Sequence, residues 1–126
     1  MSDLTTSLAF AASGMEAQAQ RLRHVSENIS NADTPGYRRK IVGFREEMNT
    51  GLVETTPVNL DQTPLQSVYD PGNPLADETG HFDGSNVDLV IEMADAREAQ
   101  RSYDANLKMF EQARQMTLSL FEILRR

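Results

Sequence analysis

The chain has no cysteine and no tryptophan, and only 6% of its residues are aromatic. Without cysteine, disulfides, thiolate metal sites and cysteine nucleophiles are excluded, and so few aromatic side chains make a bulky globular core hard to build. No run approaches the roughly 20 apolar residues of a membrane-spanning helix, so we expect no membrane insertion. Basic residues are outnumbered, with 12 Lys and Arg against 19 Asp and Glu. The resulting net charge of −7 argues against nucleic acid as a partner.

Motifs of catalysis are missing as well. The sequence has no glycine-rich phosphate loop and no serine elbow of the hydrolase type. Its two histidines, His24 and His81, are far apart and lie in segments of different type. The acidic loop with Asp77, Glu78 and Asp83 around His81 does not have the spacing of a calcium loop, and we interpret it as solvated surface. We therefore expect no enzyme, no cofactor and no metal site.

The longest regular pattern lies at residues 86–126, which contain neither proline nor glycine. Apolar or small residues recur there at steps of three and four, as on one side of an α-helix. Ser85 and Asn86 are predicted to cap this helix, with Asp88 in its first turn. A helix over this range would be roughly 55–60 Å long, so its apolar side needs a partner along its length. The predicted subunit-packing residues are Val90, Met93, Tyr103, Leu107, Phe110, Leu120 and Leu124.

Residues 1–36 predict a second long helix that ends in a turn. Apolar residues follow a heptad pattern there, which is typical of a coiled coil. They are predicted to pack subunits through Leu4, Leu8, Ala11, Met15, Leu22, Val25 and Ile29. Gly14, at a cost of about 1 kcal/mol relative to alanine, fits either the close approach of a neighbouring helix or a plain two-helix hairpin. Pro35 and Gly36 then predict a type II turn.

The middle segment, residues 37–85, holds four of the five prolines. Short strands are predicted near 40–45, 52–55 and 65–69. Because large apolar residues are few here, we expect this segment to lean on the helices or on a neighbour. The basic triplet 38–40 fits either a solvated strand start or a contact with the acidic face of a neighbouring subunit. The predicted fold is mainly α, with the two terminal helices paired as an antiparallel coiled coil around a small loop- and β-rich middle segment.

Two motifs at opposite ends of the chain resemble a known family. Residues 28–37, NISNADTPGY, are similar to the N-terminal signature of bacterial flagellar rod and hook proteins. Residues 85–93, SNVDLVIEM, with 99–106, AQRSYDAN, resemble their C-terminal signature. The motif residues are Asn28, Asn31, Thr34, Pro35, Gly36, Tyr37, Asn86, Val87, Asp88, Tyr103 and Asn106. Hook and distal-rod members carry large inserted domains between the two motifs, so the short middle segment resembles the proximal rod subunits.

The resemblance implies a structural subunit of the flagellar basal-body rod, the axial drive shaft that passes motor torque across the periplasm to the hook. It implies as partners other rod proteins, copies of the same chain, the base of the motor (ring and export gate) and the distal rod. It also implies export by the flagellar type III apparatus without a cleaved signal. The opening residues 1–4 agree with this, since they lack the regions of a Sec-type signal. The alternatives are another type of short rod protein, and a soluble coiled-coil adaptor or export chaperone.

Overall fold

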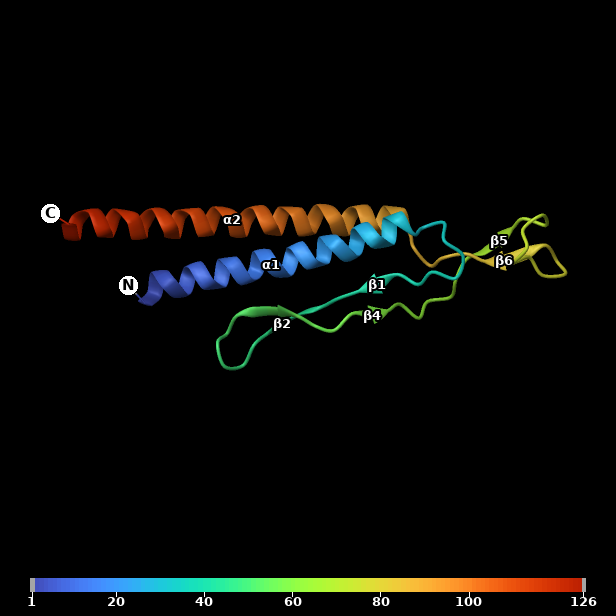
Figure 1. Cartoon of the computed structure of the whole chain (residues 1–126), viewed down its shortest axis with the longest axis horizontal. Coiled ribbons are helices and arrows are strands. Elements are labelled where there is room, and N and C mark those ends of the chain that lie inside the picture. The colour runs from blue at the N-terminus through green and yellow to red at the C-terminus, as the bar shows by residue number, and fades with distance from the viewer. Residues whose placement is uncertain (1, 126) are drawn as a thin grey trace.

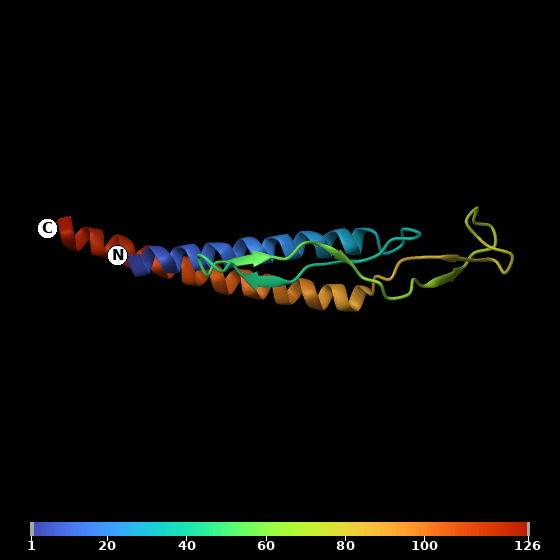
Figure 2. The same ribbon diagram turned by 90° about the horizontal axis from the view of Figure 1, so that it is seen from below.

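The computed structural model describes residues 2–125, which form two long helices joined by a segment of short strands (Figure 1). Helix α1 spans Ser2–Ser30 and helix α2 spans Leu89–Arg125. They run antiparallel and lie side by side in both views (Figures 1 and 2). The predicted mainly α class, with a long helix at each end, is confirmed. In the described residues neither helix has an apolar stretch that could cross a membrane.

The two helices differ in length, with 29 residues in α1 and 37 in α2. At about 1.5 Å per residue the difference is roughly 12 Å. The C-terminal end of α2 accordingly extends past the start of α1 (Figures 1 and 2). The last turns of α2 therefore have no partner within the chain.

The strands form three antiparallel pairs in the middle segment. The pairs are β1 (Lys40–Ile41) with β4 (Asn59–Leu60), β2 (Phe44–Glu46) with β3 (Val53–Thr55), and β5 (Ser67–Tyr69) with β6 (His81–Asp83). The predicted strands near 40–45, 52–55 and 65–69 are present, whereas β4 and β6 were not predicted. Residues 37–63, which hold β1 to β4, form one long hairpin, and residues 64–84, which hold β5 and β6, form a second one that we name the tongue.

The hairpin folds back along α1, whereas the tongue points away from both helices (Figures 1 and 2). The hairpin is tied to α1 by hydrogen bonds. Val53 N donates to Ser13 Oγ at 3.2 Å, and Thr55 Oγ1 donates to Gln20 Oε1 at 2.7 Å. The expectation that the middle segment leans on the helices thus holds for its first half only, because the tongue has no such support within the chain.

The surface that pairs the two helices is built from small and polar side chains. On α2 the innermost positions recur every seven residues, at Glu92, Ala99, Asn106 and Ala113, and three of these four are buried. On α1 the buried residues are Ala11, Gly14, Ala17, Val25 and Asn28. Apart from Val25 and Val87, every buried apolar residue among those described is an alanine.

The buried edge of α1 agrees with the predicted apolar pattern at Ala11 and Val25 and is displaced by one position at two others. Gly14 and Asn28 are buried, while the adjacent apolar residues Met15 and Ile29 are half-exposed and exposed. The reason lies in α2. A Cβ added at Gly14 would come within 2.9 Å of the Asn106 side chain, so only glycine fits at this crossing without a shift. The two interpretations of Gly14, close approach of a helix and a two-helix hairpin, therefore describe the same contact, because the closely approaching helix is the chain's own α2.

Candidate functional site

The first sequence motif ends α1 and turns the chain. Helix α1 stops at Ser30, and Tyr37 N then donates to Thr34 O at 3.2 Å across Pro35 and Gly36. Gly36 has a φ of 75°, the left-handed conformation that the third residue of a type II turn requires. Its N–H donates to the carbonyl oxygens of residues 83 and 84, at the end of the tongue. The predicted turn is therefore present. Directly after it, Tyr37 O accepts from Asn86 N at 3.3 Å, which joins the two motifs.

Asn28, the first residue of that motif, is buried and uses all of its hydrogen-bonding groups. Its Nδ2 donates to Lys40 O at 2.9 Å and to Glu92 Oε2 at 3.2 Å. Its Oδ1 accepts from the Tyr37 hydroxyl and from Lys40 N, both at 2.8 Å. A primary amide has two donors and two acceptor sites, so this side chain is saturated. One residue thus joins α1, β1 and α2.

Asn86, in the second motif, does not cap α2 as predicted. Its Oδ1 accepts from Arg39 N at 2.7 Å, and its Nδ2 donates to Asp61 O at 2.9 Å and Thr63 O at 3.1 Å. Helix α2 begins three residues later than expected, at Leu89, where Asp88 Oδ1 accepts from Val90 N at 3.0 Å. Asp88 is therefore the N-cap, because the Asn86 amide is already occupied by the hairpin.

The central ion pair joins Arg39 and Glu92. Arg39 Nε lies 2.6 Å from Glu92 Oε1, and the Glu92 side chain is 0% exposed. The same guanidinium lies 3.4 Å from both Asp61 and Asp95. Burial alone would lower the pKa of Arg39, but the hydrogen bonds and charges of Glu92 and Asp61 outweigh it and raise that pKa. The arginine stays charged, and the carboxylate that it neutralises is fully enclosed.

The other members of the basic triplet also bind within the chain. Lys40 Nζ lies 2.7 Å from Glu27 Oε2, and Arg38 Nη1 donates to the carbonyl oxygens of Asp61 and Thr63 at 3.2 Å. Lys40 begins β1 with its side chain 37% exposed, so the predicted strand start is present. Arg39 and Lys40 meet carboxylates of their own chain and fasten the hairpin to the helix pair, whereas Arg38 binds within the hairpin. A contact of the triplet with an acidic neighbouring subunit stays a prediction.

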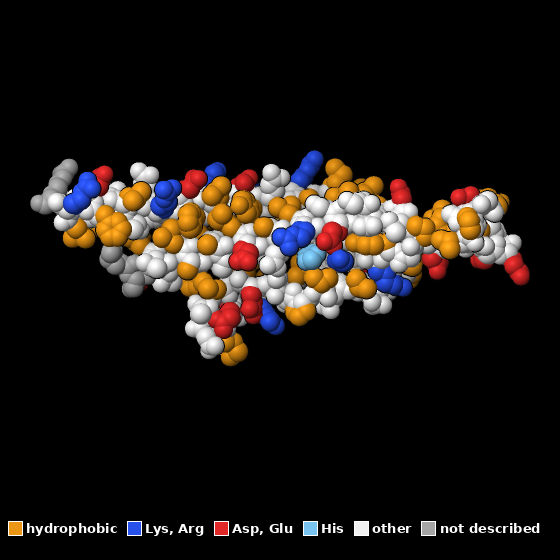
Figure 3. All heavy atoms as spheres, viewed as in Figure 1, with side chains coloured by type: hydrophobic (Ala, Val, Ile, Leu, Met, Phe, Trp, Pro, Cys, Tyr) orange, Lys and Arg blue, Asp and Glu red, His pale blue; other side chains and the backbone are white. Residues whose placement is uncertain are grey.

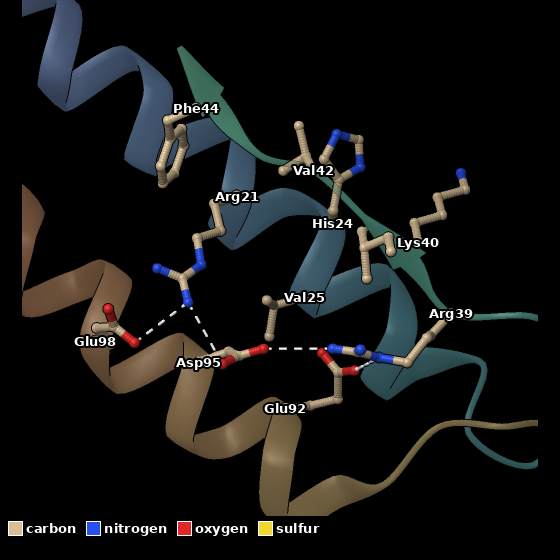
Figure 4. A pocket seen from close by; sticks show the side chains of 11 residues that line it. Arg21, His24, Val25, Arg39, Lys40, Val42, Phe44, Glu92, Asp95 and Glu98 are labelled. Carbon is tan, nitrogen blue, oxygen red and sulfur yellow. Dashed lines mark hydrogen bonds and ion pairs between the residues drawn. The ribbon is translucent and has the colours of Figure 1, made fainter. Parts of the chain in front are cut away.

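Beside the central pair lies a cleft of about 400 Å³ between α1, β1 and α2, shown in Figure 4. Arg21 reaches across it, with its Nη2 at 3.4 Å from both Asp95 and Glu98. His24 also lines the cleft, and its buried Nδ1 has no hydrogen-bond partner. The three carboxylates of α2 in this cleft share two arginines, Arg21 and Arg39, and each lies within 3.4 Å of one of them. Because every carboxylate has an arginine partner, the arrangement holds charges in place and leaves no free pair for acid–base chemistry.

The residues predicted to pack subunits are divided between two environments. Ala11 and Val25 are buried inside the chain's own helix pair, and others are half-buried there: Leu4, Leu8, Met15, Leu22, Tyr103, Leu107 and Phe110. Val90, at 76% exposed, and Leu124, at 73%, stand free of it. Ile29, Met93 and Leu120 are exposed as well. Packing between subunits through these side chains stays a prediction.

The remaining motif residues lie in two places. The end of α1, the hairpin and the start of α2 meet in one place, which we name the junction. Asn31, Thr34 and Val87 belong to it; Thr34 Oγ1 donates to Asn31 Oδ1 at 3.1 Å, and Val87 is buried. Tyr103 and Asn106 lie in the middle of α2, and Asn106 faces Gly14. The candidate site is thus a structural junction. Arg39 and Glu92 are its centre. The sequence offers only a weak signal for them: Glu92 is a carboxylate in the seven-residue series whose later members are Ala99, Asn106 and Ala113.

Comparison with known proteins agrees with this picture. Residues 8–38 match a family model described as "Flagella basal body rod protein", and residues 78–123 match "Flagellar basal body rod FlgEFG protein C-terminal". The match at 78–123 also covers the last part of the tongue, which includes β6. Both motifs therefore lie inside regions that characterise rod proteins.

Full-length relatives give the same result. The chain is 45% identical to the flagellar basal-body rod protein FlgC of Agrobacterium fabrum, over 99% of this chain and 98% of the relative. It is 38% identical to FlgC of Salmonella typhimurium, over 86% and 88%, and 34% identical to FlgC of Aquifex aeolicus, over 97% and 98%. These names favour a FlgC-like protein over the rival short rod protein FlgB, and over an adaptor or chaperone. The chain belongs to the flagellar basal-body rod protein family, as a structural rod subunit and not an enzyme.

Proposed function

We propose that this chain is a subunit of the proximal rod, where copies of itself and other rod proteins cover the apolar side chains that the single chain leaves exposed. The observation that carries this proposal is the C-terminal end of α2. Apolar residues occupy more than half of the helix circumference there, and all are exposed: Leu118, Leu120, Phe121, Ile123 and Leu124. A polar side remains at Ser119 and Glu122. An apolar stripe of this width on a helix normally packs against a partner. Figure 3 shows hydrophobic side chains along α2 and at this end.

The energy of covering these side chains is large relative to what the chain buries alone. Burying one large apolar side chain fully contributes about 1.5–3 kcal/mol. Five of them at the end of α2 would contribute on the order of 10 kcal/mol as an upper figure. Within the chain, the fully buried apolar residues are mainly alanines, and the larger side chains of the helix pair are only half-buried. Assembly is therefore expected to supply a major part of the stability of the rod-bound subunit.

The mechanical role follows from the same contacts. Torque from the motor would pass toward the hook through many parallel helix–helix contacts rather than through one residue. The base of the motor and the distal rod are the expected neighbours at the two ends of the proximal rod. A small core also suits export, because a chain that is weakly stable alone is easily unfolded for the flagellar type III apparatus, which needs no cleaved signal.

A double substitution at the end of α2 tests the proposal. Ile123→Asp/Leu124→Asp places two charges where neighbouring subunits are expected to exclude water. We expect the chain to disappear from purified basal bodies and motility to be lost, while circular dichroism of the isolated subunit is unchanged. Glu122→Gln, in the same turn of α2 as Ile123 and Leu124, is the matched control and should assemble normally. Normal motility of the double variant would overturn the proposal.

A further inference from the structure

The tongue carries charge of one sign together with exposed apolar side chains. Residues 64–84 contain the four acidic residues Asp70, Asp77, Glu78 and Asp83, and no Lys or Arg. All four are exposed, and none forms an ion pair with another described residue. Figure 3 shows red and orange side chains and no blue ones over this projecting end.

The exposed apolar residues of the tongue are large. Tyr69 is 66% exposed, Leu75 62% and Val68 38%. The loop between its strands is nevertheless well fixed, since Asp77 Oδ1 accepts from Thr79 N at 2.9 Å and from His81 N at 3.1 Å. A two-stranded hairpin alone is only marginally stable in water and gains stability by packing against a helix. The tongue therefore has the character of a docking element.

A groove on α2 has the complementary properties. It runs along the side of the helix opposite to the buried edge, as two adjoining hollows of about 690 and 530 Å³ that share Arg97 and Arg101. Its apolar end is formed by Val90, at 76% exposed, and Met93, at 53%. Lys108 lines its other end.

The charge of the groove is positive. Its three cations, Arg97, Arg101 and Lys108, form no ion pair with another described residue. Its two carboxylates are Glu98, which also lies 3.4 Å from Arg21, and Asp104. Three cations thus face two carboxylates, beside an apolar patch. An acidic, apolar tongue fits this surface in both respects.

The tongue and the groove of one chain cannot meet. The tongue and α2 extend in opposite directions along the long axis of the molecule (Figures 1 and 2). We propose that the tongue of one copy docks in the α2 groove of a second copy, so that Tyr69 and Leu75 cover Val90 and Met93 and the acidic residues face the arginines. Because the two surfaces differ, this contact is heterologous and continues from copy to copy. The inference rests on the proposed self-assembly of the chain and names the surfaces that perform it.

Cysteine cross-linking tests the contact directly, because the wild-type chain has no cysteine. Leu75→Cys and Val90→Cys are introduced together into the full chain, and basal bodies from flagellated cells are oxidised. Each copy then carries one thiol on the tongue and one in the groove, so a ladder of multiples of 14.1 kDa is expected. The matched control is Met48→Cys with Val90→Cys, since Met48 is 97% exposed but lies in the hairpin, and it should give no ladder.

The other outcomes are separable. A band that joins this chain to a different rod protein would show another occupant of the groove and overturn the inference. The same holds if the chain is recovered in basal bodies without any cross-link, an outcome that leaves the proposed rod function standing. Absence of even the wild-type chain from basal bodies would instead refute the proposed function.

A charge exchange gives an independent readout. Glu78→Arg or Arg101→Glu alone places like charges opposite each other, and we expect the amount of chain recovered in basal bodies to fall about tenfold or more. The two substitutions together restore opposite charges and should restore recovery. Glu46→Arg, an exposed carboxylate on the hairpin, is the control and should have little effect. Failure of the double variant to recover more than either single variant would contradict the pairing.

Discussion

Asn28 and Asn86 form hydrogen bonds with backbone N–H and C=O groups of the hairpin that have no partner in a helix or strand pair. Asn28 binds both the N–H and the C=O of Lys40, and Asn86 binds the N–H of Arg39 and the C=O of Asp61. Their amides hold the start of the hairpin between the two helix ends, as an extra strand would. A buried backbone group without a partner costs about 1–3 kcal/mol, which explains why an amide stands at each position.

Arg39 and Glu92 are expected to dominate stability among single residues. In Arg39→Met the Glu92 carboxylate stays buried with only the Asn28 amide to balance it. Because one buried charge is then uncompensated, the free energy of unfolding should fall by about 3–5 kcal/mol. The double variant Arg39→Met/Glu92→Met leaves no such charge and should recover most of the loss. Urea unfolding followed by circular dichroism measures all three proteins.

Arg38→Met is the matched control for that comparison. Its guanidinium donates only to the carbonyl oxygens of Asp61 and Thr63. The expected loss is therefore about 1 kcal/mol, the usual contribution of such hydrogen bonds. Equal losses in Arg38→Met and Arg39→Met would show that the enclosed ion pair has no special weight.

At the scale of the elements, periodicity predicts both helices but misplaces part of the edge along which they pair. Ala11 and Val25 are buried as the pattern predicts. The pattern also includes the large apolar residues Met15 and Ile29, because apolar size is the usual sign of a buried edge. The actual edge holds Gly14 and Asn28. Such residues become inner positions only when the partner offers a matching group, here Asn106 and Glu92. That match depends on pairing between distant segments, which no local pattern contains.

The crossing of α1 and α2 at Gly14 gives a prediction at this scale. Gly14→Ala should gain about 1 kcal/mol from helix propensity, but its Cβ would meet the Asn106 side chain at 2.9 Å. We therefore expect little or no gain in the wild-type background and most of the gain in an Asn106→Ala background. Thermal unfolding of the four proteins gives the coupling energy. The same gain in both backgrounds would contradict the close crossing.

The whole molecule is elongated, with its strongest internal contacts at the junction and its largest apolar side chains outside. Its buried apolar residues are small, and charge pairs hold the hairpin to the helices. Hydrophobic burial within one chain is therefore modest, and acid–base equilibria should weigh heavily in the stability of the isolated subunit.

Acid should consequently unfold the subunit in a defined pH range. Hydrogen bonds lower the pKa of four carboxyl groups. Glu27 accepts such a bond from Lys40, Glu47 from Thr50, Asp61 from Thr63 and Asp77 from Thr79. Their ordinary values are 4.5 for Glu and 3.8 for Asp. A carboxyl group whose pKa is lower in the folded state stabilises the fold above its unfolded pKa, and this stability is lost as the pH falls through the folded pKa. The melting temperature should therefore decrease as the pH is lowered from about 4.5.

Asp61 offers the sharpest test of this pH dependence, because its carboxylate binds both Thr63 and Arg39 at the junction. In Asp61→Asn that contribution is absent at every pH. The melting temperature of this variant should be lower than that of the wild type at neutral pH, and the difference should shrink as the pH falls below about 4. Asp33→Asn, at an exposed position with no ion pair to another described residue, is the control for the loss of one charge. A difference for Asp61→Asn that stays constant from neutral pH to pH values well below 3.8 would show that the ionised carboxylate contributes nothing to the junction.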